Sequence, residues 1–464
     1  MKKNSEMYQL VYEYYETRIL LGFYTCHDKL PSIPKICEIF HFAPVTVHTA
    51  LSLLEKNGYI KLSARRTAEV VFDASPETLR QNAFDYFIVR RQGVIEIAKS
   101  GALLLEPLWI EGLRRWSDEE WNALFEGILT FPQTPLSSPV EFYLFAINAL
   151  NNRLALNLLW EVIRYLRFPY LANGMETFSE LQEMDSLTKD EAIALFKKDA
   201  KSTYLWTSQR LFHFLDEAAL ETSCDTKEQI PFSWNIYRQR PQLRYSLSSR
   251  LIREIMQGKY PEGTYLPSLS QMVKLYGVPM MTVRRALEIL EEFGFTKSYH
   301  GKGTQVYIRP VELDFTKSPI QEGCRFYLDS LQILALTIRG ISFHTWTHAA
   351  SKKKEALLKN LSLLLSEKKC SLCIESCLIF IEQESTLPMV QECYTRLREL
   401  LTWGYPLTLA RFKGQNMDEK YETSITSIIQ CLTEKSPEKF SAALETLLLE
   451  EEKCSRQFWT PYIN

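Results

Sequence analysis

One segment of the chain, residues 266–304, organises the rest of the sequence: it reads LPSLSQMVKLYGVPMMTVRRALEILEEFGFTKSYHGKGT. Two runs with apolar residues at helical spacing are separated by Gly277, and a basic, glycine-rich stretch follows them. This pattern predicts a helix, a turn, a second helix and then a β-hairpin with a basic tip. In such an element one helix enters the major groove of DNA, and the hairpin lies against the backbone or the neighbouring groove.

The same pattern occurs again 236 residues upstream, over residues 30–67. No insertion or deletion separates the two copies, and the identities fall at positions that a helix-turn-helix needs. They are Gly22 and Gly258, Tyr24 and Tyr260, Leu30-Pro31-Ser32 and Leu266-Pro267-Ser268, Thr46-Val47 and Thr282-Val283, Ala50-Leu51 and Ala286-Leu287, Leu54-Glu55 and Leu290-Glu291, and Gly58 and Gly294. The long spacing indicates that a whole domain is duplicated, because solenoid repeats are only about 20–50 residues long.

The repeated residues have identifiable structural tasks. Ser32 and Ser268 are expected to cap a helix N-terminus, and Gly277 to allow the turn between the two helices. The last strand of each wing is expected at residues 70–72 and 306–308. The buried side of the first recognition helix should consist of residues at i, i+3, i+4 and i+7, namely Val47, Ala50, Leu51 and Leu54.

Composition limits the class of protein. The chain has 464 residues, of which 46% are hydrophobic and 24% charged, which is typical of a globular protein with several domains. Its net charge is −2, so affinity for nucleic acid has to come from a local basic patch. We expect no membrane contact and a cytoplasmic location, because no long apolar run and no apolar signal core occur. Ten cysteines without regular pairing favour a reducing compartment.

The fold expected from these patterns is mainly α, with two winged helix-turn-helix domains alternating with two all-helical bundle domains. The four domains are placed at residues 1–74, 75–237, 238–310 and 311–464. Each winged domain carries a small β-hairpin, and the helical domains are interpreted as sensor or dimerisation domains. Residues 188–219 are long for one uninterrupted helix, so two helices are an alternative there.

The two duplicated segments resemble the winged helix-turn-helix of GntR-type transcription regulators. In that family the typical run is Leu-Pro-Ser-Glu-Arg, then Ser-Arg-x-Thr-Val-Arg-x-Ala-Leu, then a Gly-x-Gly-Thr wing. Arg284 matches the arginine after Thr-Val, residues 301–304 match the wing, and Arg285 is an additional base. Pro279-Met280 replaces the family's Ser-Arg pair. The first copy departs further, because His48 stands where Arg284 stands and its wing lacks glycine.

The resemblance implies DNA-contacting residues in both copies, and the charges favour the second copy. Residues 238–309 hold twelve Lys and Arg against five Asp and Glu, whereas residues 1–73 hold nine against eight. Bidentate guanine contacts are expected from Arg284 and Arg285. The candidates are Ser268, Thr282, Arg284, Arg285, Gly301, Lys302, Gly303 and Thr304 in the second copy, and Ser32, Lys35, Thr46, His48, Arg65 and Arg66 in the first. A solvated helix face is the alternative interpretation of the basic residues.

Family resemblance also implies that a helical domain senses a small molecule, often an organic acid. Arg164, Arg167 and Arg210 lie in apolar helical stretches, where a guanidinium would bind a carboxylate or form an internal ion pair. The metal site of one GntR subfamily needs several histidines, and His213 is the only histidine between His48 and His300. We therefore expect no metal and no cofactor.

Two further groups have both a structural and a functional interpretation. His344 and His348 are spaced to bind a metal from one helix face, but no third ligand stands nearby in the sequence. The cysteines Cys370, Cys373 and Cys377 would share one face of a helix, and with Cys393 they are interpreted as core residues, with a redox or metal sensor as the alternative.

The sequence therefore predicts a sequence-specific, DNA-binding transcription regulator that binds an operator in double-stranded DNA and senses a small-molecule effector. Two unequal readers on one chain suggest an intramolecular pseudo-dimer, and a homodimer is the alternative. No catalytic motif occurs, so we expect no enzyme activity. A different function is also open: an interaction or scaffold protein, in which the first winged helix docks a protein and only the second binds DNA.

Overall fold

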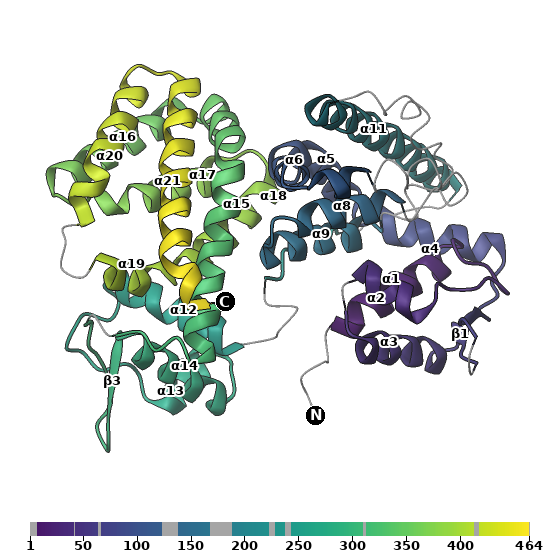
Figure 1. Ribbon diagram of the computed structural model, residues 1–464, viewed down its shortest axis with the longest axis horizontal. Helices are drawn as coiled ribbons and strands as arrows, with labels where there is room; N and C mark the ends of the chain where they lie inside the picture. The colour runs from purple at the N-terminus through teal and green to yellow at the C-terminus, as the bar shows by residue number, and fades with distance from the viewer. Residues whose placement is uncertain are drawn as a thin grey trace. The chain divides into compact units, whose positions relative to one another are not determined.

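The computed structural model describes residues 7–463 except 41, 64–65, 123–137, 168–187, 222–227, 237–242, 310–311 and 413–416. The chain divides into two compact units, residues 1–240 and 241–464. Each unit begins with a helix-turn-helix and a hairpin and continues as helices (Figure 1). The boundary between the units lies close to the one expected from the sequence, whereas the division of each unit into two domains stays a prediction.

The first winged-helix domain consists of α1 (Met7–Leu20), α2 (Ile33–Phe40), α3 (Pro44–Lys56), β1 (Ile60–Lys61) and β2 (Glu69–Val70). The two strands are antiparallel, with Ile60 opposite Val70. The predicted apolar stripe of α3 is buried: Val47, Ala50, Leu51 and Leu54 are at most 2% exposed. These side chains hold α3 against the rest of the domain, so the opposite face of the helix is left at the surface.

The second winged-helix domain repeats this order with α12 (Leu243–Met256), α13 (Leu269–Tyr276), α14 (Met280–Glu292), β3 (Thr296–Tyr299) and β4 (Gly303–Val306). Its hairpin is longer than the first, with four residue pairs from Thr296–Val306 to Tyr299–Gly303. The chain before α13 also joins the wing, because the amide of Leu266 donates to the carbonyl of Thr304. Leu30 and Ala68 form the equivalent bond in the first domain, again 236 residues away.

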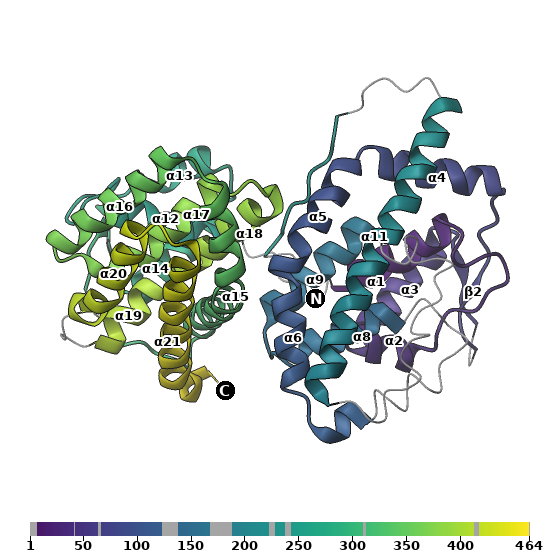
Figure 2. The same ribbon diagram turned by 90° about the horizontal axis from the view of Figure 1, so that it is seen from above.

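The remainder of the first unit is helical. Its helices are α4 (Pro76–Ile88), α5 (Arg91–Leu104), α6 (Glu106–Arg114), α8 (Ser138–Asn148), α9 (Arg153–Leu166) and α11 (Lys189–Glu221). Figure 2 shows α11 crossing α5 and α6, which it contacts. Residues 189–221 form one uninterrupted helix, so of the two alternatives for this stretch the structure contains the single helix.

The remainder of the second unit is a larger helical bundle. It contains α15 (Ser318–His348), α16 (Ser351–Ser366), the short 3₁₀ helix η2 (Cys370–Leu372), α17 (Cys373–Glu384), α18 (Pro388–Leu401), α19 (Gly404–Phe412), α20 (Met417–Thr433) and α21 (Pro437–Ile463). The two long helices α15 and α21 pack side by side (Figure 1). The expectation of a mainly α fold with two small β wings is confirmed.

The expected position of the last wing strands was wrong. The structure places these strands at Glu69–Val70 and Gly303–Val306, earlier than residues 70–72 and 306–308. The apolar residues after Val306 instead leave the hairpin, although the amide of Tyr307 still bonds the carbonyl of Phe295. Among the residues that the structure describes, no helix has the length and apolar character needed to cross a membrane.

Candidate nucleic-acid interface

The recognition helix of the second winged-helix domain, α14, has one buried face and one exposed face. Val283, Ala286, Leu287 and Leu290 are buried. The exposed side chains at i, i+3, i+4 and i+7 are Met281, Arg284, Arg285 and Glu288. These four share one side of the helix because successive turns bring such positions together. The exposed face therefore carries two guanidinium groups and one carboxylate.

The guanidinium groups of Arg284 and Arg285 are available to a ligand. Neither side chain forms a hydrogen bond or an ion pair with any part of the chain that the structure describes. The same is true of Lys302 at the wing. Exposed cations without an internal partner can neutralise phosphates or donate to base edges, since little structure has to be broken first.

The equivalent face of α3 in the first domain has a different chemistry. Its exposed positions are occupied by Val45, His48, Thr49 and Ser52. The hydroxyl of Thr49 donates to the carbonyl of Val45 at 2.8 Å, so part of its bonding capacity is used within the helix. These four positions carry no fixed positive charge, and the exposed Lys56 lies one turn beyond Ser52 on the same face. The exposed faces of α3 and α14 therefore differ in chemistry at matching positions.

The second wing projects as a hairpin with an exposed tip (Figure 1). Gly301 and Gly303 have φ angles of +73° and +104°, in a region that side chains disfavour. These glycines place His300 and Lys302 at the outer end of the hairpin, where both are exposed. The first wing has only two-residue strands; Arg66 is exposed there, and Arg65 lies outside the described residues.

The remaining candidates take part in the fold of the helix-turn-helix. Ser268 forms a capping box with Gln271, whose amide nitrogen donates to the serine hydroxyl oxygen at 3.4 Å. The hydroxyl oxygen of Ser32 accepts a hydrogen bond of the same length from the backbone amide of Lys35. Lys35 is half-buried. Thr282 and Thr304 are half-buried, whereas Thr46 is only 1% exposed, so its side chain lies in the core and off the outer face.

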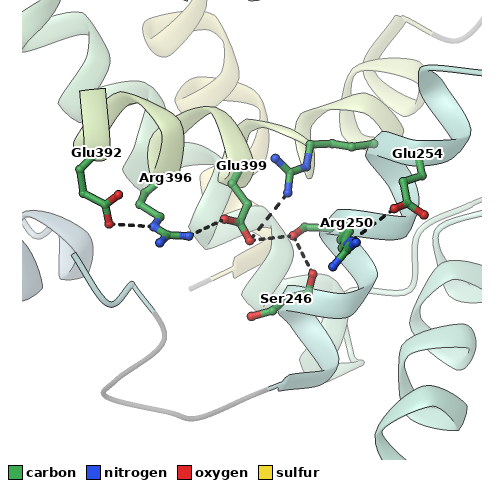
Figure 3. A network of polar contacts seen from close by, with 8 residues as sticks. Ser246, Arg250, Glu254, Glu392, Arg396 and Glu399 are labelled. Carbon is green, nitrogen blue, oxygen red and sulfur yellow. Dashed lines mark hydrogen bonds and ion pairs between the residues drawn. The ribbon is translucent and has the colours of Figure 1, made fainter. Parts of the chain in front are cut away.

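In the second unit, polar contacts join the winged-helix domain to the helical bundle. On α18, Arg396 bridges Glu392 and Glu399, at 3.1 and 3.4 Å (Figure 3). Glu399 in turn accepts from Ser249 of α12 at 3.5 Å and lies 4.0 Å from the guanidinium of Arg253. The helix α12 of the second winged-helix domain is therefore connected to α18 of the bundle by a series of polar contacts.

The same helix also contacts α13 of the helix-turn-helix. The hydroxyl of Tyr276 in α13 donates to Glu254 of α12 at 2.7 Å. Arg250 donates to the same carboxylate at 3.3 Å (Figure 3). Burial acts to raise the pKa of Glu254, but hydrogen bonds from Tyr276, Lys259 and Arg250 outweigh it and hold the pKa below the usual value. α12 thus contacts both the bundle and α13 through hydrogen bonds to a carboxyl group.

Aromatic packing supports this junction. The ring of Trp403, between α18 and α19, lies 5.7 Å from that of Tyr245 on α12 and 5.4 Å from that of Phe293 at the end of α14. All three side chains are at most 2% exposed. Gly323 on α15 fits against Phe293 and Trp403, where a Cβ atom would approach ring carbons to 2.9 Å. The recognition helix is therefore packed directly against the bundle.

The three arginines proposed as ligand contacts in the first unit have three different environments. Arg164 lies 3.1 Å from Glu13 on α1 and 3.1 Å from Glu161, so it joins α9 to the first winged-helix domain. Arg167 stacks its guanidinium 3.7 Å from the ring centre of Tyr86. Arg210 is exposed on α11. The internal ion pair that was the alternative for these residues is present at Arg164.

The cysteines and histidines singled out in the sequence lie in the helical part of the second unit. Cys370, Cys373, Cys377 and Cys393 are buried, and burial raises the pKa of Cys373 to about 12, which disfavours the reactive thiolate. Their positions agree with the core interpretation. His344 and His348 lie on α15 with ring centres 4.2 Å apart. Within the described ranges, no group of three or more His, Cys, Asp or Glu side chains is placed to bind a metal ion.

A buried ionic cluster in the second bundle was missed from the sequence. Glu451 on α21 is 3% exposed and lies 2.5 Å from Arg411 of α19 and 2.7 Å from Lys420 of α20. Burial acts to raise the pKa of Glu451, but the two cations outweigh it and lower the pKa. Hydroxyl groups complete the shell of the carboxylate, contributed by Tyr327, Tyr421 and Ser455. The cluster corresponds to no sequence motif, because its side chains come from four helices that are separate in the sequence.

Comparison with known proteins identifies the two winged-helix domains. The family described as bacterial regulatory proteins, gntR family, matches residues 7–70 and 245–306. Fatty acid metabolism regulator proteins of Shewanella frigidimarina and Shewanella denitrificans are each 39% identical over 56 residues, which are 12% of this chain. The chain spans about a quarter of the length of these curated relatives, 23% in both cases.

Solved structures with similarity to the chain include GntR regulators. A Streptococcus agalactiae GntR is 17% identical, with 45% of this chain and 99% of that chain covered and a TM-score of 0.22. A putative GntR regulator from Rhodococcus sp. RHA1 is 15% identical, with 46% and 96% covered and a TM-score of 0.27. The matched family and the curated relatives are regulatory proteins and not enzymes. The chain thus carries two winged helix-turn-helix domains of the GntR type.

Proposed function

We propose that the protein is a sequence-specific, DNA-binding transcription regulator with two unequal readers on one chain. The observation that carries this proposal is the exposed face of α14, where Arg284 and Arg285 point outward without an internal partner. Phosphate neutralisation supplies most non-specific affinity, and arginines in the major groove supply base discrimination. The second winged helix has cations for phosphates and arginines for base edges. The exposed face of the first has His48 and Thr49 in place of the two arginines.

The helical domains are proposed to sense a small effector and to change the position of the readers. In the second unit this requires a physical connection, and α12 supplies a suitable one through Glu399 on one side and Tyr276 on the other. An effector that binds one arrangement of the bundle better than another would shift the reader with it. The curated relatives match this chain over only 56 residues, so their similarity does not suggest which effector binds.

Two non-identical readers on one chain favour an intramolecular pseudo-dimer that binds an asymmetric operator. A symmetric homodimer of single-reader chains would present identical recognition helices and read a palindrome. Here the corresponding positions hold Arg284-Arg285 and His48-Thr49, so two half-sites under one chain should differ in sequence. A footprint with two equivalent half-sites under a single chain would contradict this arrangement.

The proposed function is tested by selection from a duplex library of randomised sequence with the full chain, followed by binding of the enriched duplex against scrambled competitor. We expect enrichment of a defined sequence and a specificity ratio of about 10³ or more. The variant Arg284→Ala/Arg285→Ala should lose this ratio. The matched control Lys352→Ala/Lys359→Ala removes two exposed charges from α16 and should retain it. Failure of the full chain to enrich any sequence would refute the proposal.

A further inference from the structure

Both recognition helices expose a large apolar side chain at the same position. Met281 is 55% exposed near the start of α14, and Val45 is 68% exposed at the matching place in α3, 236 residues earlier. Met280, beside Met281, is 43% exposed. About half of each of these apolar side chains stays in contact with water, and burial against a partner would remove that surface.

The placement of Met281 on its helix restricts what it can contact. It lies on the same face as Arg284 and Arg285, one turn nearer the N-terminus of α14. In a helix-turn-helix, the residues at the start of the recognition helix are the ones that meet base edges in the major groove. The apolar feature on those edges is the 5-methyl group of thymine, which other bases lack.

We propose that Met281 in the second reader and Val45 in the first select thymine by contact with its 5-methyl group, with Met280 contributing to the same apolar surface. This inference rests on the proposed function and extends it by naming the base and the atom. Positive charge around the apolar group favours DNA as the occupant, because Arg284, Arg285 and Lys302 are exposed in the same domain. The arginines orient the helix on guanines and phosphates, and the apolar residue then reads the adjacent base pair.

The two readers should differ in how strictly they select this base. Met281 has an unbranched, flexible side chain, which adapts to small shifts of the methyl group. Val45 is β-branched and restricted to few rotamers, so its contact depends on one position of the helix in the groove. Both contacts predict a preferred thymine in the operator, with one such position in each half-site. The two positions should lie at equivalent distances from the centre of the recognition helix that contacts them.

The test uses the duplex enriched by the full chain and replaces each thymine singly by uracil, which lacks only the 5-methyl group. At one or two positions under the second reader, uracil should weaken binding about fourfold, as expected for one buried methyl group. In Met281→Ala the difference between thymine and uracil at that position should become smaller, and in Met280→Ala/Met281→Ala it should disappear. In Val45→Ala the corresponding difference under the first reader should disappear. These side chains are exposed, so the variants should keep the thermal stability of the wild type.

Leu363→Ala is the matched control, because Leu363 is 52% exposed on α16 and lies in the bundle. It should retain the full difference between thymine and uracil at every position. The inference is overturned if a sequence is enriched and depends on Arg284 and Arg285, but uracil binds as well as thymine throughout. In that case the proposed function stands. If no sequence is enriched, the inference falls together with the proposed function.

Discussion

The substitution Glu451→Gln tests whether the buried ionic cluster determines the stability of the second unit. Glutamine has nearly the same shape as glutamate but lacks its charge. Arg411, whose side chain is 8% exposed, would remain buried without the carboxylate that now lies 2.5 Å away. Removal of one partner of a buried ion pair typically costs about 3–5 kcal/mol. Lys420 is 33% exposed and can be hydrated by water, so the loss of its ion pair with Glu451 adds little to the destabilisation.

The expected effect on melting follows from the size of the unit. For domains of about 150–250 residues, 1 kcal/mol shifts the Tm by about 2–4 °C, so Glu451→Gln should lower the Tm of the unit by about 6–20 °C. The assay is calorimetric melting of the full chain, with hydrogen exchange of peptides from α15 and α21 to locate the change. Glu450→Gln alters the exposed neighbouring residue on the same helix and should leave the Tm within about 1 °C.

The dependence on pH has a defined sign. Because the pKa of Glu451 is lowered from 4.5 in the folded protein, its ionisation stabilises the fold at pH values above 4.5. This contribution is lost as the pH falls through the folded pKa. The difference between wild type and Glu451→Gln should therefore stay constant from about pH 8 to 5 and shrink in more acidic solution. An unchanged Tm in Glu451→Gln at pH 7 would refute the reasoning about the cluster.

Three further outcomes are expected. Arg164→Ala should destabilise the first unit by about 3 kcal/mol, measured by chemical denaturation, because Glu161 is 3% exposed and loses its cation; a stable variant would instead leave the ligand role of Arg164 open. Lys302→Ala should make the salt dependence of DNA binding shallower by about one unit of log K against log salt, measured by anisotropy, and an unchanged slope would place Lys302 away from phosphate. A maleimide should label the exposed Cys454 well before the buried Cys373 and Cys377, followed by mass spectrometry, and DNA binding should be unaffected by the label at Cys454.

The winged helices were predictable because their signals are local. The spacing of Val47, Ala50, Leu51 and Leu54 gave the buried face of α3, and an ungapped duplication gave the same face in α14. The glycine between the two helices predicted a turn that needs a positive φ, and Gly277 has a φ of +66°. The exposed face followed from the same periodicity, so Arg284, Arg285 and His48 lie at the surface as expected. Whether these residues contact DNA stays a prediction.

Features that depend on tertiary contact were not predictable from one sequence. The helices α6 and α19 have only nine residues each, and so short a segment contains too little apolar periodicity to place a helix from the sequence. The pairing of Arg164 with Glu13 joins residues far apart in the chain, and apolar periodicity contains no information on it. The same applies to Glu451, whose partners lie on other helices. A charged residue in an apolar helix indicates that an oppositely charged partner is present, but the sequence does not identify that partner.

The central claim, two unequal readers on one chain, is tested most directly by one comparison of affinities. Anisotropy titration of the enriched duplex, at one salt concentration, compares Arg284→Ala/Arg285→Ala with His48→Ala/Thr49→Ala, which alters the matching positions of the first reader. Loss of one bidentate contact costs about 1–3 kcal/mol, so the variant, which loses two, should bind at least about thirtyfold more weakly. The first-reader variant should lose less than about fivefold. Equal losses, or a larger loss from the first reader, would contradict the claim.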